Sequence, residues 1–275
     1  MAGPPPATAE LHLREEGSGE PVLLLHGLGG DHTVFNAQIR PLAERFHVLA
    51  PDLRGHGRSP TPDGSTFTFD ELEQDLEALV EARGTGPVHL VGLSAGGFLA
   101  LRWVLDRPER VRSLILLSTA AQCDGHTRAI AQHWAEVYRD KGYDAYVMRL
   151  LKDLYQAEWL EEHLEVIDHA LATLRGQDLR AAVQWGLAVR NFDVRNRISQ
   201  IRAPTSVAHG MEDRVIDASH ARFLRQAIPG TELKLFPFTG HMLPVERAEE
   251  TTRLLLEWLA RPPRRPGSAG PAPSP

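Results

Sequence analysis

The segment of residues 88–97 constrains the fold of this chain more than any other part of the sequence. Residues 88–93 are mostly apolar and predict a buried strand, and the apolar run of residues 98–105 predicts a helix. Ser94 lies between them. The chain must therefore turn sharply from a strand into a helix, with a serine at the apex of the turn.

Two glycines make such a turn possible. Gly92 and Gly96 lie two residues before and after Ser94, which is the Gly-x-Ser-x-Gly pattern of a nucleophile elbow. Side chains at these positions are expected to collide with the neighbouring strand and helix, and the apex residue is expected to have a strained backbone. The serine hydroxyl then stands clear at a helix N-terminus, where free amides favour negative charge. The pattern alone also fits a turn without chemistry, and the flanking strand and helix favour the elbow.

Strand and helix patterns alternate along most of the chain. Strands are expected near residues 9–14, 21–25, 48–50, 88–93, 110–117, 204–209 and 233–236. Helices are expected near residues 35–46, 68–80, 98–105, 218–228 and 245–259, with Thr68 as a helix cap. This alternation predicts an α/β fold with a mostly parallel central sheet that helices cover on both faces.

The alternation stops between residues 121 and 197, where helical runs are expected near residues 129–139, 143–155, 158–174 and 179–189. We expect a helical cap (lid), residues 121–197, inserted into a core of residues 1–120 and 198–261. Residues 262–275 are rich in Pro, Gly, Ala and Ser and are expected to be a disordered tail. Binding pockets are mostly apolar, so aromatic residues of the cap and one methionine are candidate substrate contacts. They are Trp134, Tyr138, Tyr146, Trp159, Trp185 and Met242.

Composition excludes several classes of protein. The net charge is −6 and no basic patch stands out, so nucleic acid is not an expected partner. One cysteine, Cys123, leaves no internal disulfide. Apolar runs such as residues 22–25 are far too short to cross a bilayer, and the N-terminal residues do not resemble a signal peptide. A cytoplasmic protein with a small-molecule substrate is expected, and the sequence leaves monomer or homodimer open.

Three polar residues follow strands of the predicted sheet. Functional groups gather at the carboxyl ends of parallel strands, and Ser94, Asp213 and His241 each follow one. A serine hydroxyl needs a base, which an imidazole supplies, and the imidazole needs a carboxylate that orients it. The pattern Gly210-x-x-Asp213 favours this acid over the neighbouring carboxylates. The neighbouring carboxylates are those of Glu212 and Asp217. Asp124, which follows an earlier strand, stays open as an alternative acid.

Acyl-transfer chemistry also needs donors for an oxyanion. We expect the amide of Ala95, directly after the serine, to supply one, and the amide of Leu28 in the loop of residues 26–30 to supply the other. That loop matches neither a dinucleotide nor a nucleoside-triphosphate motif. His26 and His56 are interpreted as structural residues of their loops.

With these residues in place, the sequence resembles a lid-containing α/β-hydrolase of the esterase, enol-lactonase and haloperoxidase type. The resemblance rests on residues 26–30 (His-Gly-Leu-Gly-Gly), 52–59 (Asp-x-Arg-Gly-His-Gly-x-Ser), 92–97 (Gly-x-Ser-x-Gly-Gly), 210–213 (Gly-x-x-Asp) and 240–241 (Gly-His), with Glu246 beyond. It implies an α/β-hydrolase fold, a catalytic triad with Ser94 as nucleophile, His241 as base and Asp213 as acid, and an oxyanion hole. It implies no cofactor and no metal. Related epoxide hydrolases and haloalkane dehalogenases carry aspartate at the apex instead.

The leading functional hypothesis is a serine hydrolase that cleaves a carboxylic ester, lactone or thioester of a small to medium apolar substrate through a Ser94 acyl-enzyme. An alternative is a non-hydrolytic biosynthetic enzyme that uses the same triad for cyclisation, acyl transfer or elimination. A third hypothesis is a small-molecule receptor built on a hydrolase scaffold. The sequence of the cap does not decide which substrate Ser94 attacks.

Overall fold

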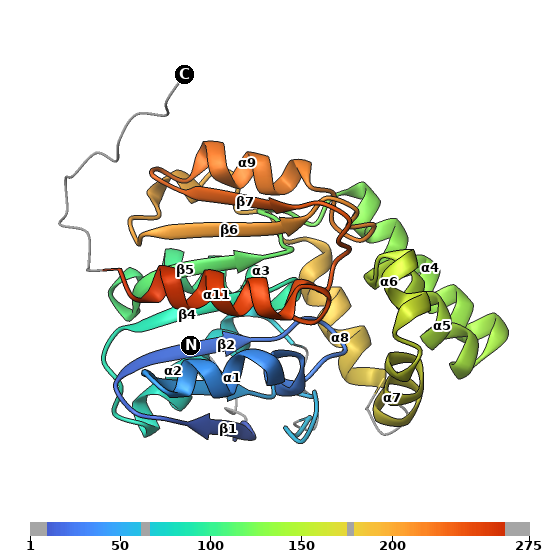
Figure 1. The fold of residues 1–275 in the computed structure, drawn as a ribbon, viewed down its shortest axis with the longest axis horizontal. Coiled ribbons are helices and arrows are strands. Elements are labelled where there is room, and N and C mark those ends of the chain that lie inside the picture. The colour runs from blue at the N-terminus through green and yellow to red at the C-terminus, as the bar shows by residue number, and fades with distance from the viewer. Residues whose placement is uncertain (1–9, 62–66, 175–178, 262–275) are drawn as a thin grey trace, which may run out of the picture.

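A seven-stranded sheet forms the centre of the protein (Figure 1). The computed structural model describes residues 10–61, 67–174 and 179–261. The strands are β1 (Leu13–Glu16), β2 (Glu20–Leu25), β3 (Phe46–Pro51), β4 (Val88–Leu93), β5 (Val111–Leu117), β6 (Thr205–Gly210) and β7 (Glu232–Phe236). Their order in the sheet is β1-β3-β2-β4-β5-β6-β7. β1 pairs antiparallel with β3, and the other neighbouring strands are parallel, so the predicted mostly parallel sheet is confirmed.

Helices cover both faces of this sheet, as predicted. Helices α1 (Asn36–Ala43) and α11 (Ala248–Leu259) share one apolar cluster, and α2 (Phe69–Ala82), α3 (Ala95–Asp106) and α9 (Ser219–Ala227) share the other. Alternate residues of β2 separate the two clusters, since Leu23 packs in one and Leu24 in the other. The strand is apolar at both positions because both of its faces are buried.

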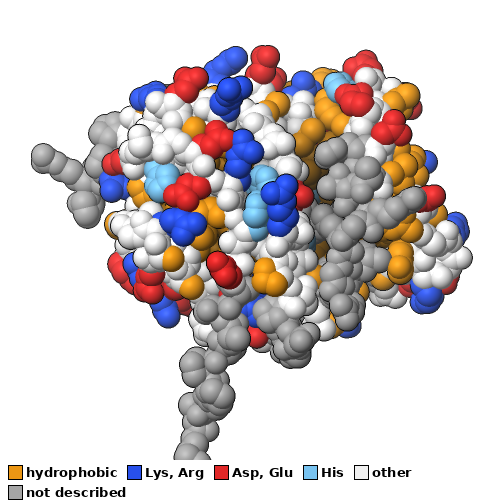
Figure 2. Space-filling view, turned by 90° about the horizontal axis from the view of Figure 1, so that it is seen from below, with side chains coloured by type: hydrophobic (Ala, Val, Ile, Leu, Met, Phe, Trp, Pro, Cys, Tyr) orange, Lys and Arg blue, Asp and Glu red, His pale blue; other side chains and the backbone are white. Residues whose placement is uncertain are grey.

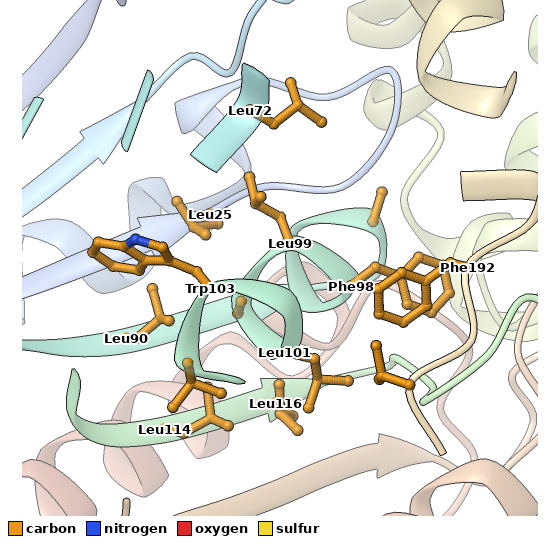
Figure 3. Close-up of a cluster of buried hydrophobic side chains, with 14 of the residues drawn as sticks. Leu25, Leu72, Leu90, Phe98, Leu99, Leu101, Trp103, Leu114, Leu116 and Phe192 are labelled. Carbon is orange, nitrogen blue, oxygen red and sulfur yellow. The ribbon is translucent and has the colours of Figure 1, made fainter. Parts of the chain in front are cut away.

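Helix α3 lies directly against the centre of the sheet. Figure 3 shows Leu101 and Trp103 of this helix near Leu90 of β4 and Leu114 of β5. These four side chains are 0% exposed. Since α3 follows Ser94 directly, this packing fixes the position of the turn that carries the serine.

Helix α2 begins at the predicted cap residue. The Thr68 hydroxyl accepts a hydrogen bond from the Glu71 amide (3.2 Å), and the Glu71 carboxylate accepts one from the Thr68 amide (2.8 Å). This reciprocal pair satisfies two amides that a helix N-terminus otherwise leaves without partners.

The chain between β5 and β6 is helical, and its two ends are joined by the bridge between Gln122 and Asp193. Its helices are α4 (Gly125–Lys141), α5 (Tyr143–Leu154), α6 (Ala157–Glu162), α7 (Glu165–Leu174) and α8 (Leu179–Arg190). Figure 1 shows α4, α5, α6 and α7 grouped on one side of the sheet, with α8 nearer to the strands. The predicted tail, residues 262–275, lies outside the described residues.

Two predicted helices are in fact interrupted. The helix expected at residues 158–174 ends with α6 and resumes as α7, because His163 leaves helical geometry (φ −128°, ψ 57°) and its ring stacks on Trp159 at 4.0 Å. The helix expected at residues 245–259 divides into α10 (Leu243–Glu246) and α11 at Arg247 (φ −128°, ψ 51°). The Arg247 side chain binds the Phe238 carbonyl (2.9 Å) at this break.

The surface shows no preference for one sign of charge on the face seen in Figure 2, where positive and negative side chains are interspersed. Within the described part of the chain, each helix is too short or too polar to cross a membrane.

Candidate active site

The turn at Ser94 has the strained geometry that the sequence predicts. Ser94 has φ 52° and ψ −118°, in the left-handed region that residues other than glycine rarely adopt. A Cβ atom on Gly92 would lie 2.7 Å from the Gly96 carbonyl oxygen, and one on Gly96 would overlap the carbonyl oxygens of Leu25 and His26. The two glycines are therefore required by close backbone approach on both sides of the serine.

Hydrogen bonds from the end of β5 hold this turn. The Ser94 amide donates to the Leu117 carbonyl (3.0 Å), and the Ser94 carbonyl accepts from the Thr119 hydroxyl (2.8 Å). The side chain of Ser94 stays partly exposed at the N-terminus of α3. Its backbone is thus fixed, while its side chain retains some exposure to solvent.

Asp213 and His241 form a buried pair at the carboxyl ends of β6 and β7. The distance between Asp213 Oδ2 and His241 Nδ1 is 2.7 Å, and His241 is 2% exposed. The other carboxylate oxygen accepts the amides of Val215 and Ile216, each at 2.9 Å. When Nδ1 of His241 donates to the carboxylate, its Nε2 carries the free lone pair that a general base needs.

A second imidazole contacts the same carboxylate. His209, the residue before the predicted Gly210-x-x-Asp213 pattern, is 0% exposed, and its Nε2 lies 3.1 Å from Asp213 Oδ2. The same Nε2 donates to the Ile216 carbonyl (2.8 Å). Burial would raise the pKa of Asp213, but the charge of His241 and the hydrogen bonds of both imidazoles hold that pKa well below its usual range. The carboxylate is therefore ionised throughout the neutral range.

The loop that carries His241 is tied to the cap through Glu246. The Glu246 carboxylate accepts the amides of Gly240 (2.9 Å), Met242 (3.0 Å) and, from the turn between α5 and α6, Gln156 (3.0 Å). Burial raises the pKa of Glu246 although these three amides oppose the shift. The sequence marked Glu246 only as part of a motif, and its contact with the cap required the structure.

The loop of residues 26–30 lies beside the serine. A Cβ atom on Gly27 would come within 3.1 Å of the Ser94 Cβ atom, so the two backbones approach closely. His26 fixes this loop, since its Nδ1 donates to the Gly27 carbonyl (2.8 Å) and its Nε2 accepts the Leu53 amide (2.8 Å). Burial lowers the pKa of His26 and lowers that of His56, next to it, to about 3. Both rings are therefore neutral, which agrees with the structural role that the sequence predicts for them.

The two predicted oxyanion donors flank the serine. Ala95 is the first residue of α3, and the first amides of a helix have no acceptor within the helix. Leu28 directly follows Gly27, which packs on Ser94. This arrangement is compatible with both amides facing an oxyanion, and that role stays a prediction.

The other candidate acids have different partners. Asp124 caps α4 through the Thr127 amide (2.8 Å) and contacts His220 (3.1 Å). Asp217 accepts the Ser219 amide (2.8 Å), and Glu212 is exposed. Of the predicted acids, Asp213 is the one paired with His241.

The predicted substrate contacts occupy different environments, and their contact with substrate stays a prediction. Trp185 of α8 is 1% exposed and donates to the Arg54 carbonyl (3.0 Å), so it anchors the cap to the core. Trp134 donates to the Asp153 carboxylate (2.8 Å), and Trp159 stacks on Tyr155 at 5.1 Å. Of the remaining three, Tyr138 and Tyr146 meet edge to face. Met242 packs on a cluster of buried side chains that includes Val147 and Leu151.

Fold and site together define a class of protein. A family model described as "alpha/beta hydrolase fold" matches residues 20–248. The chain belongs to this family, and it is a hydrolase of the α/β fold. The fold and family expected from the sequence motifs are thus confirmed.

Several known proteins resemble the chain over most of its length. "Putative carbamate hydrolase RutD" from Variovorax paradoxus (strain S110) is 34% identical over 259 residues, covering 91% of this chain and 96% of that protein. Among solved structures, the enol-lactonase from Burkholderia xenovorans LB400 superimposes with a TM-score of 0.84 at 25% identity, covering 92% of this chain and 97% of its own. A thermophilic esterase from Thermogutta terrifontis gives a TM-score of 0.81 at 30% identity, covering 91% and 93%.

Proposed function

We propose that the protein hydrolyses a carboxylic ester, lactone or thioester of a small to medium apolar substrate through an acyl-enzyme on Ser94. The observation that carries the proposal is the buried Asp213–His241 pair (2.7 Å), which directs the free Nε2 of His241 away from its acid partner. The strained, partly exposed serine at the N-terminus of α3 supplies the matching nucleophile.

In the first half-reaction, His241 Nε2 takes the proton of the Ser94 hydroxyl as Oγ bonds to the substrate carbonyl carbon. The amides of Leu28 and Ala95 stabilise the resulting oxyanion, and each such donor contributes roughly 3 kcal/mol. The intermediate collapses, the bond to the leaving oxygen or sulfur breaks, and His241 returns the proton to it. Water then attacks the acyl-enzyme by the same route, which releases the acid and regenerates Ser94.

Carbamate hydrolysis is a second candidate, favoured by the 34% identity to a protein with the name "carbamate hydrolase". Attack of Ser94 on a carbamate carbonyl requires the same base and oxyanion donors, and it forms a carbamoyl-enzyme instead. The esterase and the enol-lactonase among the similar structures support the first candidate.

A fluorophosphonate probe tests the nucleophile, and a substrate panel tests the class of bond. Wild-type protein should react with the probe at Ser94, and Ser94→Ala should not. The panel comprises p-nitrophenyl esters of increasing chain length, lactones, thioesters and alkyl carbamates. Turnover that Ser94→Ala abolishes supports hydrolysis and identifies the preferred bond.

Failure of folded wild-type protein to react with the probe would contradict the acyl-enzyme. Probe labelling without turnover of any panel member would favour the non-hydrolytic use of the triad. The receptor hypothesis predicts instead that ligand-dependent partner binding persists in Ser94→Ala.

A further inference from the structure

Three side chains from separate segments converge beside the loop of residues 26–30. They are His12, which precedes β1, His32, which begins a 3₁₀ helix (His32–Phe35), and Asp52, which follows β3. One nitrogen or oxygen of each lies within 4.8 Å of the others. None of the three belongs to the proposed catalytic site.

Asp52 is the buried centre of this cluster, with its side chain 1% exposed. Oδ1 accepts hydrogen bonds from the amide of His32 (2.9 Å) and from Nδ1 of the same residue (2.6 Å), whose proton an ion at this position would replace. Oδ2 accepts the amide of Arg58 (2.9 Å) and faces His12 Nδ1 at 3.0 Å. Each oxygen thus uses one lone pair on a backbone amide and directs the other toward an imidazole nitrogen.

The contact with His12 is not an ordinary hydrogen bond. Its Nδ1 is buried and close to the carboxylate, but the geometry of a hydrogen bond is not met, and this atom has no hydrogen-bond partner in the structure. Buried polar nitrogens are rarely left in this condition without a reason, such as an ion that completes the site. The His12 side chain is 27% exposed and that of His32 is 11% exposed, so the cluster lies close to the protein surface.

We propose that His12, His32 and Asp52 bind one divalent first-row transition-metal ion of the Zn²⁺ type. Two neutral imidazoles and one carboxylate form a donor set that suits zinc and its neighbours, whereas Mg²⁺ and Ca²⁺ prefer oxygen ligands alone. The two backbone amides on Asp52 orient the carboxylate from outside the ligand set, as outer partners do in metal sites. Water supplies the remaining ligands on the exposed side.

Such an ion would join three segments that adjoin the proposed oxyanion loop. Asp52 donates its amide to the His12 carbonyl (2.9 Å), and His32 follows Gly30 by two residues. The ion therefore fixes the residues just before β1, the end of β3 and the segment after the loop relative to one another. We expect it to act by stabilising the fold rather than by chemistry.

One neighbouring group opposes the ion. The exposed Arg58 side chain places its Nη1 at 3.4 Å from His12 Nε2, where its positive charge repels a cation. When Nδ1 of His12 binds the ion, the ring carries its proton on Nε2. That proton and the Arg58 N–H then face each other as two donors without an acceptor. Arg58→Gln removes both effects and keeps the backbone amide that binds Asp52, so this substitution should raise the affinity.

Titration of the full chain, without an affinity tag, tests the site. Zn²⁺ is added in a calorimeter at pH 7.5, and Co²⁺ binding is followed by its visible absorption. We expect one equivalent of each ion and a higher Tm with Zn²⁺, because binding to the folded state alone stabilises it. His12→Ala and His32→Ala should each weaken binding about 10-fold or more.

Matched controls separate this site from other histidines and from the proposed function. His47→Ala removes a partly exposed histidine that pairs with Glu15 (2.7 Å) in the adjoining part of the sheet, and it should bind Zn²⁺ like the wild type. Ser94→Ala should also bind normally, since the proposed catalytic serine is not a ligand. His12→Gln, with circular dichroism, confirms that weaker binding does not reflect loss of the fold.

Tighter binding by Arg58→Gln together with weaker binding by both ligand variants supports the proposal. Absence of saturable Zn²⁺ binding overturns it, as does binding that persists undiminished in folded His12→Ala or His12→Gln. Equal affinity for Ca²⁺ overturns the assignment to transition metals.

Discussion

A single carboxylate, Asp213, organises the proposed catalytic residues. Its two oxygens meet two backbone amides and two imidazole nitrogens, at distances between 2.7 and 3.1 Å. Each contact restricts rotation of the carboxylate, and the contact with His241 in turn fixes which imidazole nitrogen is free. The sequence predicted the Asp213–His241 pair from two strand ends, but His209 was not among the predicted site residues. The sequence does not predict which way the ring of a histidine at the end of a buried strand points.

Replacing Asp213 with asparagine tests this arrangement. Asn keeps the shape of the side chain, but its amide group removes the charge and can direct a donor at His241 Nδ1, which stabilises the wrong tautomer. We expect kcat on the best panel substrate to fall about 10³- to 10⁴-fold, with little change in KM. Glu212→Gln alters an exposed neighbour and should keep wild-type kcat. An unchanged kcat in folded Asp213→Asn would assign the acid to another residue.

At the scale of elements, Glu246 couples the cap to the loop after β7. Its carboxylate accepts hydrogen bonds from amides of the cap and of this loop. The His241 amide also donates to the Leu154 carbonyl at the end of α5 (2.7 Å). Glu246→Gln replaces one acceptor oxygen with a donor that faces a buried amide, so at least one hydrogen bond is lost.

We expect Glu246→Gln to lower both kcat and Tm, with a loss of about 1–3 kcal/mol in the free energy of unfolding. Glu249→Gln, in the first turn of α11, is the matched control and should change neither quantity. Steady-state kinetics and thermal melts measure the two effects. A lower Tm with wild-type kcat would limit Glu246 to a structural role.

Helix α2 carries a buried acid, Glu73, whose protonation should make stability depend on pH. Burial and the charge of Asp106 together raise its pKa from 4.5 to about 7, against the opposing charge of Arg102. Between pH 4.5 and 7 the folded protein holds a proton that the unfolded chain has lost, so stability falls as pH rises through this window. Above pH 7 the full cost of burying the ionised Glu73 carboxylate remains.

Glu73→Gln removes this penalty. We expect it to raise the free energy of unfolding by about 1–2 kcal/mol at pH 8, and by much less near the ordinary pKa of glutamate. Asp70→Asn, whose exposed side chain also contacts Arg102 (3.0 Å), should have a small effect at either pH. Denaturant melts at several pH values measure the difference, and an equal effect at all of them would contradict the raised pKa.

The order of strands and helices was predictable because burial on two faces imposes continuous apolar strands such as β2 and β4. The breaks at His163 and Arg247 were not, since neither has a glycine or proline beside it and both depend on contacts made in the folded state. The same holds for the His12–His32–Asp52 cluster. Its successive members are 20 residues apart in sequence and lie in different segments, so no local pattern joins them.

At the scale of the whole molecule, the cap divides into two parts by its packing. Ala181, Trp185 and Val189 of α8 belong to the main apolar cluster between the sheet and α3. Four buried residues of α5, α6 and the turn between them instead form a small separate cluster, which comprises Val147, Leu151, Tyr155 and Leu160. Helix α8 therefore shares the stability of the core, whereas α5 and α6 rest on fewer buried contacts.

Hydrogen exchange should show this division directly. Amides in core strands and in α8 around Trp185 should exchange only through global unfolding, because opening α8 exposes part of the main core. Amides of α5 around Val147 should exchange through a smaller, local opening, and Leu151→Ala should speed their exchange more than that of β4. Mass spectrometry of peptides from α5, α8 and β4 follows the three regions. If α8 exchanged together with α5, the whole cap would open as one body, and substrate entry would require movement of Trp185.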